Sequence, residues 1–249
     1  MLSDTSENSK PPPEQVMPTL TAEEKAVILS KAAEGTRRVH CIEITSCDIL
    51  PFLDDGHKLG ATAIDAVAAV YQQAAEEEAD TYWLVLSAWF GPIVEGTVIE
   101  GRHTKTTVEY LQQAANGQNL EVLLAKTLWI IPLCSSKEPK HWVVTWVDWK
   151  ELKIGIFDSI PELGSSSWAE PLLLRIIDHI CVALKREPID WDSGSWRRVL
   201  ESPSNLQQQM DLWSCGLFVL MRIRGFKDGR GLEAVSFSNM NPGDKAAHG

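Results

Sequence analysis

The stretch HWVVTWVDWKELKIGIFDS (residues 141–159) predicts a β-hairpin and sets the fold. It contains two strand-like runs, WVVTWVDW (142–149) and KIGIFDS (153–159), which are rich in β-branched and aromatic residues. Strands of this kind pair when a short turn joins them. We place the centre of the turn at Trp149-Lys150.

This register brings two polar residues together at the open end of the hairpin. Facing residues have numbers that sum to 299, so His141 is expected opposite Asp158. Directly opposed β-carbons in an antiparallel ladder lie about 4.5–5.5 Å apart. An imidazole and a carboxylate in these positions would be within hydrogen-bonding reach.

On both sides of the hairpin, the chain alternates between strand-like and helical patterns. The run LWIIPL (128–133) predicts a further strand, and an Ala-rich run over 59–79 predicts a buried helix. The apolar run 82–90 fits a buried strand or a short helix equally well. An amphipathic pattern over 168–185 and an apolar run that begins at Cys215 predict two more helices.

The ends of the chain differ in composition from this central part. Residues 1–18 are polar and include three consecutive prolines, which predicts a disordered lead. Residues 227–249 form a polar, Gly-containing tail. We therefore expect one principal domain over residues 19–226.

Composition excludes several classes of protein. The 249 residues are 44% apolar and carry a formal net charge of −11, which disfavours nucleic acid as a partner. The five cysteines form neither an even framework nor a C-x-x-C pair, so neither a disulfide scaffold nor a metal site is expected. With no apolar leader and no stretch of membrane-spanning length, we expect a protein of a reducing compartment, the nucleus or the cytoplasm.

The cysteine that best completes the hairpin pair is Cys215. It follows a polar loop and opens an apolar helix, where unpaired backbone N–H groups and the helix dipole favour a thiolate. The carboxylate of Asp158 would orient the imidazole of His141, which would then take the proton of the thiol. The small neighbour Gly216 leaves space at the sulfur.

A further candidate lies six residues before this cysteine. The side-chain amide of Gln209 could donate to the oxyanion of a tetrahedral intermediate, with backbone N–H groups near Cys215 as the second donor. The chemistry predicted is acyl transfer through a thioester.

These motifs, in this order, resemble the SUMO and ubiquitin-like-protein proteases, a family in the same clan as the adenovirus-type cysteine proteases. The resemblance rests on four features in this order: TLWIIPL, His141-Trp142, Phe157-Asp158-Ser159, and Gln209 ahead of Cys215-Gly216. A weaker resemblance extends from about Ile42 to Phe226.

The resemblance implies an α+β, papain-like fold in which a small sheet flanked by helices faces the Cys215 helix. It implies cleavage after the C-terminal Gly-Gly of a SUMO-like modifier, without a cofactor. It also implies that Cys215 is the nucleophile, His141 the base and Asp158 its orienting partner. Gln209 would be the oxyanion donor, and Trp142 a supporting residue of the substrate site.

Two positions differ from the family pattern inside the predicted domain. Ser214 stands where the family usually has aspartate, immediately before the cysteine. Lys58-Leu59-Gly60-Ala61 stands where a Trp-Leu-Asn-Asp motif normally opens the first core helix and its tryptophan covers the Gly-Gly tail. The sequence also becomes polar after Phe226, where the family continues with further helix.

Two alternatives follow from these observations. A degenerate, non-catalytic module would still bind a modifier or another protein. A competent peptidase would instead act on ubiquitin, another modifier or an unrelated protein. Taken singly, a cysteine before an apolar helix is more often a buried small hydrophobe than a nucleophile.

Overall fold

The computed structural model describes most of the central part of the chain. The described residues are 37–39, 42–52, 57–78, 82–96, 106–115, 124–201 and 211–227, with the single positions Ala26, Ser30, Gly35 and Glu121. The lead predicted at 1–18, the oxyanion donor Gln209 and the tail beyond Lys227 lie outside these residues.

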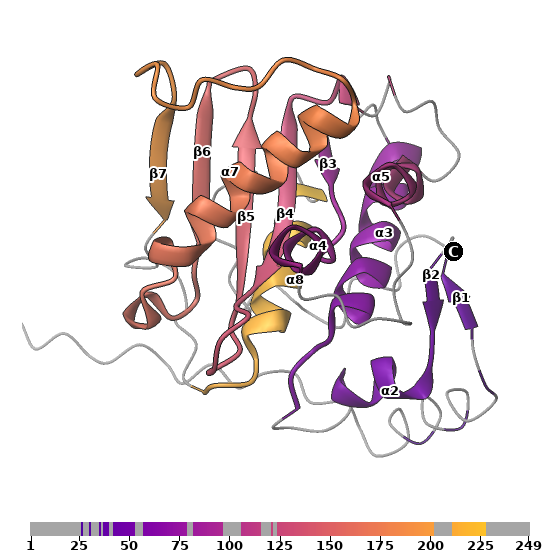
Figure 1. Cartoon of the computed structure of the whole chain (residues 1–249). Coiled ribbons are helices and arrows are strands. Elements are labelled where there is room, and N and C mark those ends of the chain that lie inside the picture. The colour runs from indigo at the N-terminus through magenta and orange to yellow at the C-terminus, as the bar shows by residue number, and fades with distance from the viewer. Residues whose placement is uncertain are drawn as a thin grey trace, which may run out of the picture.

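A five-stranded mixed sheet forms the centre of the domain (Figure 1). Its strands lie side by side in chain order, with β3 parallel to β4, β5 antiparallel to both neighbours, and β7 parallel to β6. Their bounds are β3 Trp83–Val85, β4 Leu128–Cys134, β5 Trp142–Asp148, β6 Lys153–Phe157 and β7 Arg197–Glu201. The strands predicted over 128–133, 142–149 and 153–159 are confirmed.

Helices cover both faces of the sheet, which explains why β4 and β5 are apolar on both sides. One face packs against α4 (Phe90–Glu95), α5 (Thr107–Ala115) and α7 (Ser166–Ala183). The other packs against α3 (Ala61–Glu78) and α8 (Cys215–Lys227). Figure 1 shows α7 across the front of the sheet and α8 behind it. The helices predicted over 59–79, over 168–185 and from Cys215 are confirmed.

Smaller elements complete the described chain. Residues 82–90, for which strand and helix were equally expected, contain β3 and the first residue of α4. A separate two-stranded ribbon precedes the sheet. The remaining elements are β1 Arg37–Val39, β2 Ile42–Ile44, α2 Ser46–Ile49 and the short 3-10 helices η1 Leu50–Phe52 and η2 Pro161–Leu163. No helix among the described residues has the length and apolar character to cross a membrane.

The register predicted for the hairpin is wrong: each residue of β5 faces a partner two positions further along the chain than predicted. The ladder pairs Asp148 with Lys153, so four residues form the turn and facing numbers sum to 301. The Asp148 carboxylate accepts hydrogen bonds from the backbone N–H groups of Lys150 and Glu151, and Leu152 adopts a left-handed φ of 50°. This side-chain closure shifts the centre of the turn one residue along the chain.

Gly155 of β6 fits this sheet because the ring of Trp146 lies over it. A β-carbon at Gly155 would come within 2.2 Å of the indole.

Strand β7, which the sequence did not indicate, pairs with β6 as an edge strand and carries Arg197 and Arg198. Charged residues of this kind protect a sheet edge from unwanted pairing.

Candidate active site

His141 and Asp158 meet at the end of the β5–β6 hairpin. His141 Nε2 lies 2.6 Å from Asp158 Oδ1, and the two residues are only 3% and 2% exposed. In the observed register Asp158 falls beside Val143, so it reaches His141 diagonally and not from directly opposite. Diagonal neighbours in a ladder remain within reach of long side chains, which is why the pair forms despite the shifted register.

The pair has strongly perturbed acid–base properties. Burial lowers the pKa of His141, but hydrogen bonding and charge from Asp158 and Cys215 reverse this and raise it to about 9. Burial raises the pKa of Asp158, but His141, the nearby Ser165 hydroxyl and the backbone N–H of Ile160 hold that pKa below its usual value. The imidazolium and carboxylate forms are therefore favoured together at neutral pH.

Cys215 is the first residue of α8 and is fully buried. Its thiol lies close enough to the imidazole of His141 to contribute to the raised pKa of that ring. Because Nε2 of His141 faces Asp158, the other ring nitrogen, Nδ1, is the one left for the thiol. The structure thus brings together the three side chains predicted from the sequence.

Asp211 holds the backbone that leads into Cys215. Its carboxylate accepts hydrogen bonds from the backbone N–H of Trp213 at 2.8 Å and of Ser214 at 2.7 Å, and from the Ser214 hydroxyl at 2.7 Å. The Ser214 carbonyl then accepts the first helical bonds of α8. A carboxylate is therefore present at this helix start, three residues before Ser214. The spacing Asp-x-x-Ser over residues 211–214 is the sequence signal for this contact.

The segment before α3 forms a wall beside Cys215. The carbonyl oxygen of Leu59 accepts a 2.8 Å hydrogen bond from the indole N–H of Trp142, which is 5% exposed. The Leu59 side chain lies against Gly216, where an added β-carbon would be 2.9 Å from Leu59 Cβ. Gly216 is thus required by this close packing. The resemblance placed the Lys58-Leu59 segment near the substrate tail, but no sequence pattern indicated the contact between Leu59 and Gly216.

A second thiol, Cys134, lies close to the site. It ends β4 opposite Trp142 and packs against the same core cluster as Cys215. Burial raises the pKa of the Cys134 thiol to about 12, with a further contribution from Cys215. This thiol is therefore protonated at neutral pH and a poor nucleophile.

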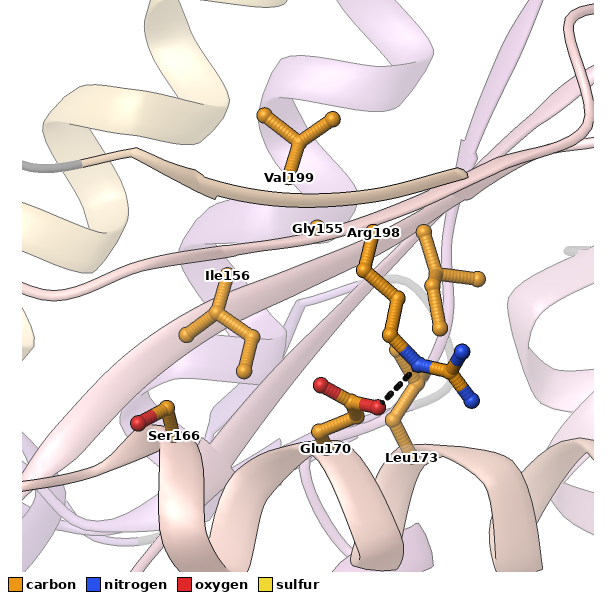
Figure 2. A pocket seen from close by; sticks show the side chains of 8 residues that line it. Gly155, Ile156, Ser166, Glu170, Leu173, Arg198 and Val199 are labelled. Atoms are coloured by element: carbon orange, nitrogen blue, oxygen red, sulfur yellow. Dashed lines mark hydrogen bonds and ion pairs between the residues drawn. The ribbon is translucent and has the colours of Figure 1, made fainter. Parts of the chain in front are cut away.

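A small pocket of about 140 Å³ lies elsewhere, between α7 and strands β6 and β7. Figure 2 shows Glu170 and Arg198 paired across it. It belongs to the face of the sheet covered by α7, whereas Cys215 belongs to the face covered by α3 and α8. Its lining residues include no cysteine or histidine: Ile154, Gly155, Ile156, Ser166, Glu170, Leu173, Arg198 and Val199.

A mixed sheet that carries a paired histidine and aspartate, faced by a cysteine at a helix start, is the arrangement of a papain-like cysteine peptidase. A profile of the Ulp1 protease family, C-terminal catalytic domain, matches residues 93–236. That match spans more than half of the 249 residues, and the chain belongs to this family. The resemblance noted in the sequence and the predicted α+β class are confirmed.

Solved structures show the same fold at low sequence identity. The SUMO protease Ulp1 is 16% identical with a TM-score of 0.53, and the alignment covers 88% of this chain and 90% of that one. The Ulp1-like SUMO protease catalytic domain of Chaetomium thermophilum gives the same identity and TM-score, with 92% and 88% covered. The Ulp1 domain in complex with Smt3, the yeast ortholog of SUMO, also gives 16% and 0.53, with 90% and 91% covered. No curated protein sequence matches significantly.

Proposed function

We propose that this chain cleaves after the C-terminal Gly-Gly of a SUMO-like modifier, maturing precursors or releasing the modifier from lysine amides. The observation that carries the proposal is the buried His141–Asp158 pair with the Cys215 thiol against the same imidazole. Family membership and the solved Ulp1–Smt3 complex support the choice of substrate.

In the proposed mechanism, the Cys215 thiolate attacks the carbonyl carbon of the terminal glycine. The His141 imidazolium, kept by a pKa of about 9, then gives its proton to the leaving amine as the thioester forms. Water activated by the neutral imidazole hydrolyses the thioester and regenerates the thiol. Asp158 orients the ring, Trp142 supports the substrate-binding wall through Leu59, and Gln209 donates to the oxyanion.

The test uses a SUMO-like modifier with a C-terminal vinyl or aldehyde trap. We expect covalent labelling at Cys215, identified by mass spectrometry, and none in Cys215→Ala. Cys181→Ser is the matched control, because Cys181 is a buried thiol on the opposite face of the sheet. Clean labelling at another cysteine would contradict the assignment.

A non-catalytic binding module is the second candidate. It is favoured by the Lys58-Leu59 segment, which stands where the family usually has its tryptophan lid. Equal binding of a modifier by wild type and Cys215→Ala, with no cleavage over long incubation, would establish it. A panel of modifier–fluorophore substrates separates SUMO-like modifiers from ubiquitin and others.

We also propose that the protein acts in a reducing compartment, the nucleus or the cytoplasm. The mechanism needs Cys215 as a free thiol, and the described cysteines, namely Cys47, Cys134, Cys181 and Cys215, are all unpaired with one another.

A further inference from the structure

Lys58 lies beside the peptide bond that joins Lys140 to His141. Its ammonium donates a hydrogen bond to the carbonyl oxygen of Lys140. The following residue, Leu59, packs on Gly216 next to Cys215. The Lys58-Leu59 segment therefore contacts both the part of the chain that supplies the histidine and the part that supplies the cysteine.

The backbone on which Lys58 is mounted is held firmly. Leu59 is 3% exposed, and its carbonyl oxygen is fixed by the Trp142 indole. The Lys58 side chain itself is only half-buried. Because the backbone and the ammonium are both anchored, little side-chain entropy remains to be lost when the ammonium binds a second group.

A second ammonium lies in the same region. Lys140 is exposed, and its Nζ donates to the carbonyl oxygen of Ser136 at 2.8 Å. The charges of Lys140 and Lys58 both oppose the rise in the pKa of Cys134 that burial causes, so both act electrostatically on the thiol next to the site. The nearby carboxylate of Glu138 binds the backbone N–H of Lys140 and not its ammonium.

We propose that Lys58 and Lys140 form a cationic site that selects substrates with an acidic side chain on the leaving-group side of the scissile bond. An ammonium has three donors, and a single carbonyl contact leaves two for a carboxylate. Lys58 stands where the family has the tryptophan that covers the Gly-Gly tail, but its ammonium bonds the carbonyl oxygen of Lys140, next to His141. We place the site on the leaving-group side for this reason, because the imidazole of His141 must lie near the amine that it protonates. The chain carries a net charge of −11, so an acidic substrate needs such a local attraction.

Selection of a substrate by this site rests on the proposed function, but the positive charge beside Cys215 can be tested without turnover. The experiment compares the rates at which iodoacetate, an anion, and iodoacetamide, a neutral reagent of similar size, alkylate Cys215. Mass spectrometry identifies the modified residue, because the chain has five cysteines. In wild type, the ratio of the iodoacetate rate to the iodoacetamide rate should fall as salt is added.

Removing either charge should lower this ratio. We expect Lys58→Met and Lys140→Met each to reduce it roughly two- to fivefold at low salt, and Lys58→Glu to reduce it further. Lys150→Met is the matched control, since Lys150 is an exposed lysine in the β5–β6 turn, at the far end of β5 from His141. An unchanged ratio in both lysine variants, an equal change in the control, or a Cys215 that neither reagent modifies would overturn the proposal.

Paired fluorogenic substrates then test selection itself. They differ in one residue after the Gly-Gly, glutamate or glutamine, and wild type should give the higher kcat/KM for glutamate. Lys58→Met should remove the difference. If nothing is turned over while the alkylation ratio depends on the lysines, the proposed function fails and the cationic site stands. Turnover without a charge preference would overturn the site and leave the peptidase intact.

Discussion

The indole N–H of Trp142 donates a 2.8 Å hydrogen bond to the carbonyl oxygen of Leu59, which lies 83 positions earlier in the chain. The bond joins the strand that follows His141 to the segment that packs on Gly216. The histidine side and the cysteine side of the site are thereby held together by one buried contact.

Trp142→Phe tests that contact. It leaves the Leu59 carbonyl buried without its donor, which should reduce the free energy of unfolding by about 1–3 kcal/mol and slow labelling of Cys215. Trp149→Phe is the control, because the Trp149 indole N–H has no hydrogen-bond partner within the described part of the chain. Urea denaturation gives the comparison, and equal losses in both variants would count against the role of the bond.

Gly216→Ala tests the packing beside the cysteine. The new β-carbon would lie 2.9 Å from Leu59 Cβ, so overpacking should cost about 1–3 kcal/mol of stability. Gly60→Ala should be mild, because no atom lies within 4 Å of its added β-carbon. Thermal unfolding should show that Gly216→Ala costs less in a Leu59→Gly background, because Leu59→Gly removes the β-carbon that the new methyl group would meet. Additive losses in the double variant would contradict the contact.

Ser214→Asp restores the residue that the family usually has before the cysteine. We expect it to impair the protein, because the Ser214 hydroxyl lies 2.7 Å from an Asp211 carboxylate oxygen and a second carboxylate there would be repelled. Stability should fall by about 1 kcal/mol or more, and iodoacetamide should modify Cys215 more slowly. Asp211→Asn combined with Ser214→Asp should recover both; a harmless Ser214→Asp would refute the argument.

Asp158→Asn tests the support of the imidazole. Without the carboxylate, the pKa of His141 should fall from about 9 towards 6.5, as NMR titration of the ring would show. The amide also permits the wrong tautomer, so kcat/KM should fall by roughly 10²–10⁴. A His141 pKa that stays near 9 in the variant would mean that Asp158 is not its main support.

The same pair predicts how stability depends on pH. The pKa of His141 is raised in the folded state, so its contribution is complete below pH 6.5 and is lost as pH rises towards 9. This contribution is about 3 kcal/mol at most. The pKa of Asp158 is lowered, so its contribution is present above pH 3.8 and is lost as pH falls below that value. Urea unfolding at pH 6 and 9.5 should show an alkaline loss in wild type that His141→Asn lacks.

The sequence alone determined the local elements and the chemical types of the site residues. Strand and helix periods located β4, β5, β6, α3 and α7, and a polar loop before an apolar run located the start of the Cys215 helix. These features are set by residues that are close together in the chain. His141 and Asp158 could be paired from the hairpin for the same reason, even though the register was misjudged.

Tertiary structure decided what depends on distant contacts. Pairing with β6 made a strand of Arg197–Glu201. The hairpin register is different, because Asp148 sets it through local bonds to the backbone of Lys150 and Glu151 that the strand pattern does not indicate. Leu59 reached Gly216 only because α3 and α8 pack on the same face of the sheet. Such contacts leave no periodic mark in the sequence, since they depend on which surfaces meet after the elements have formed.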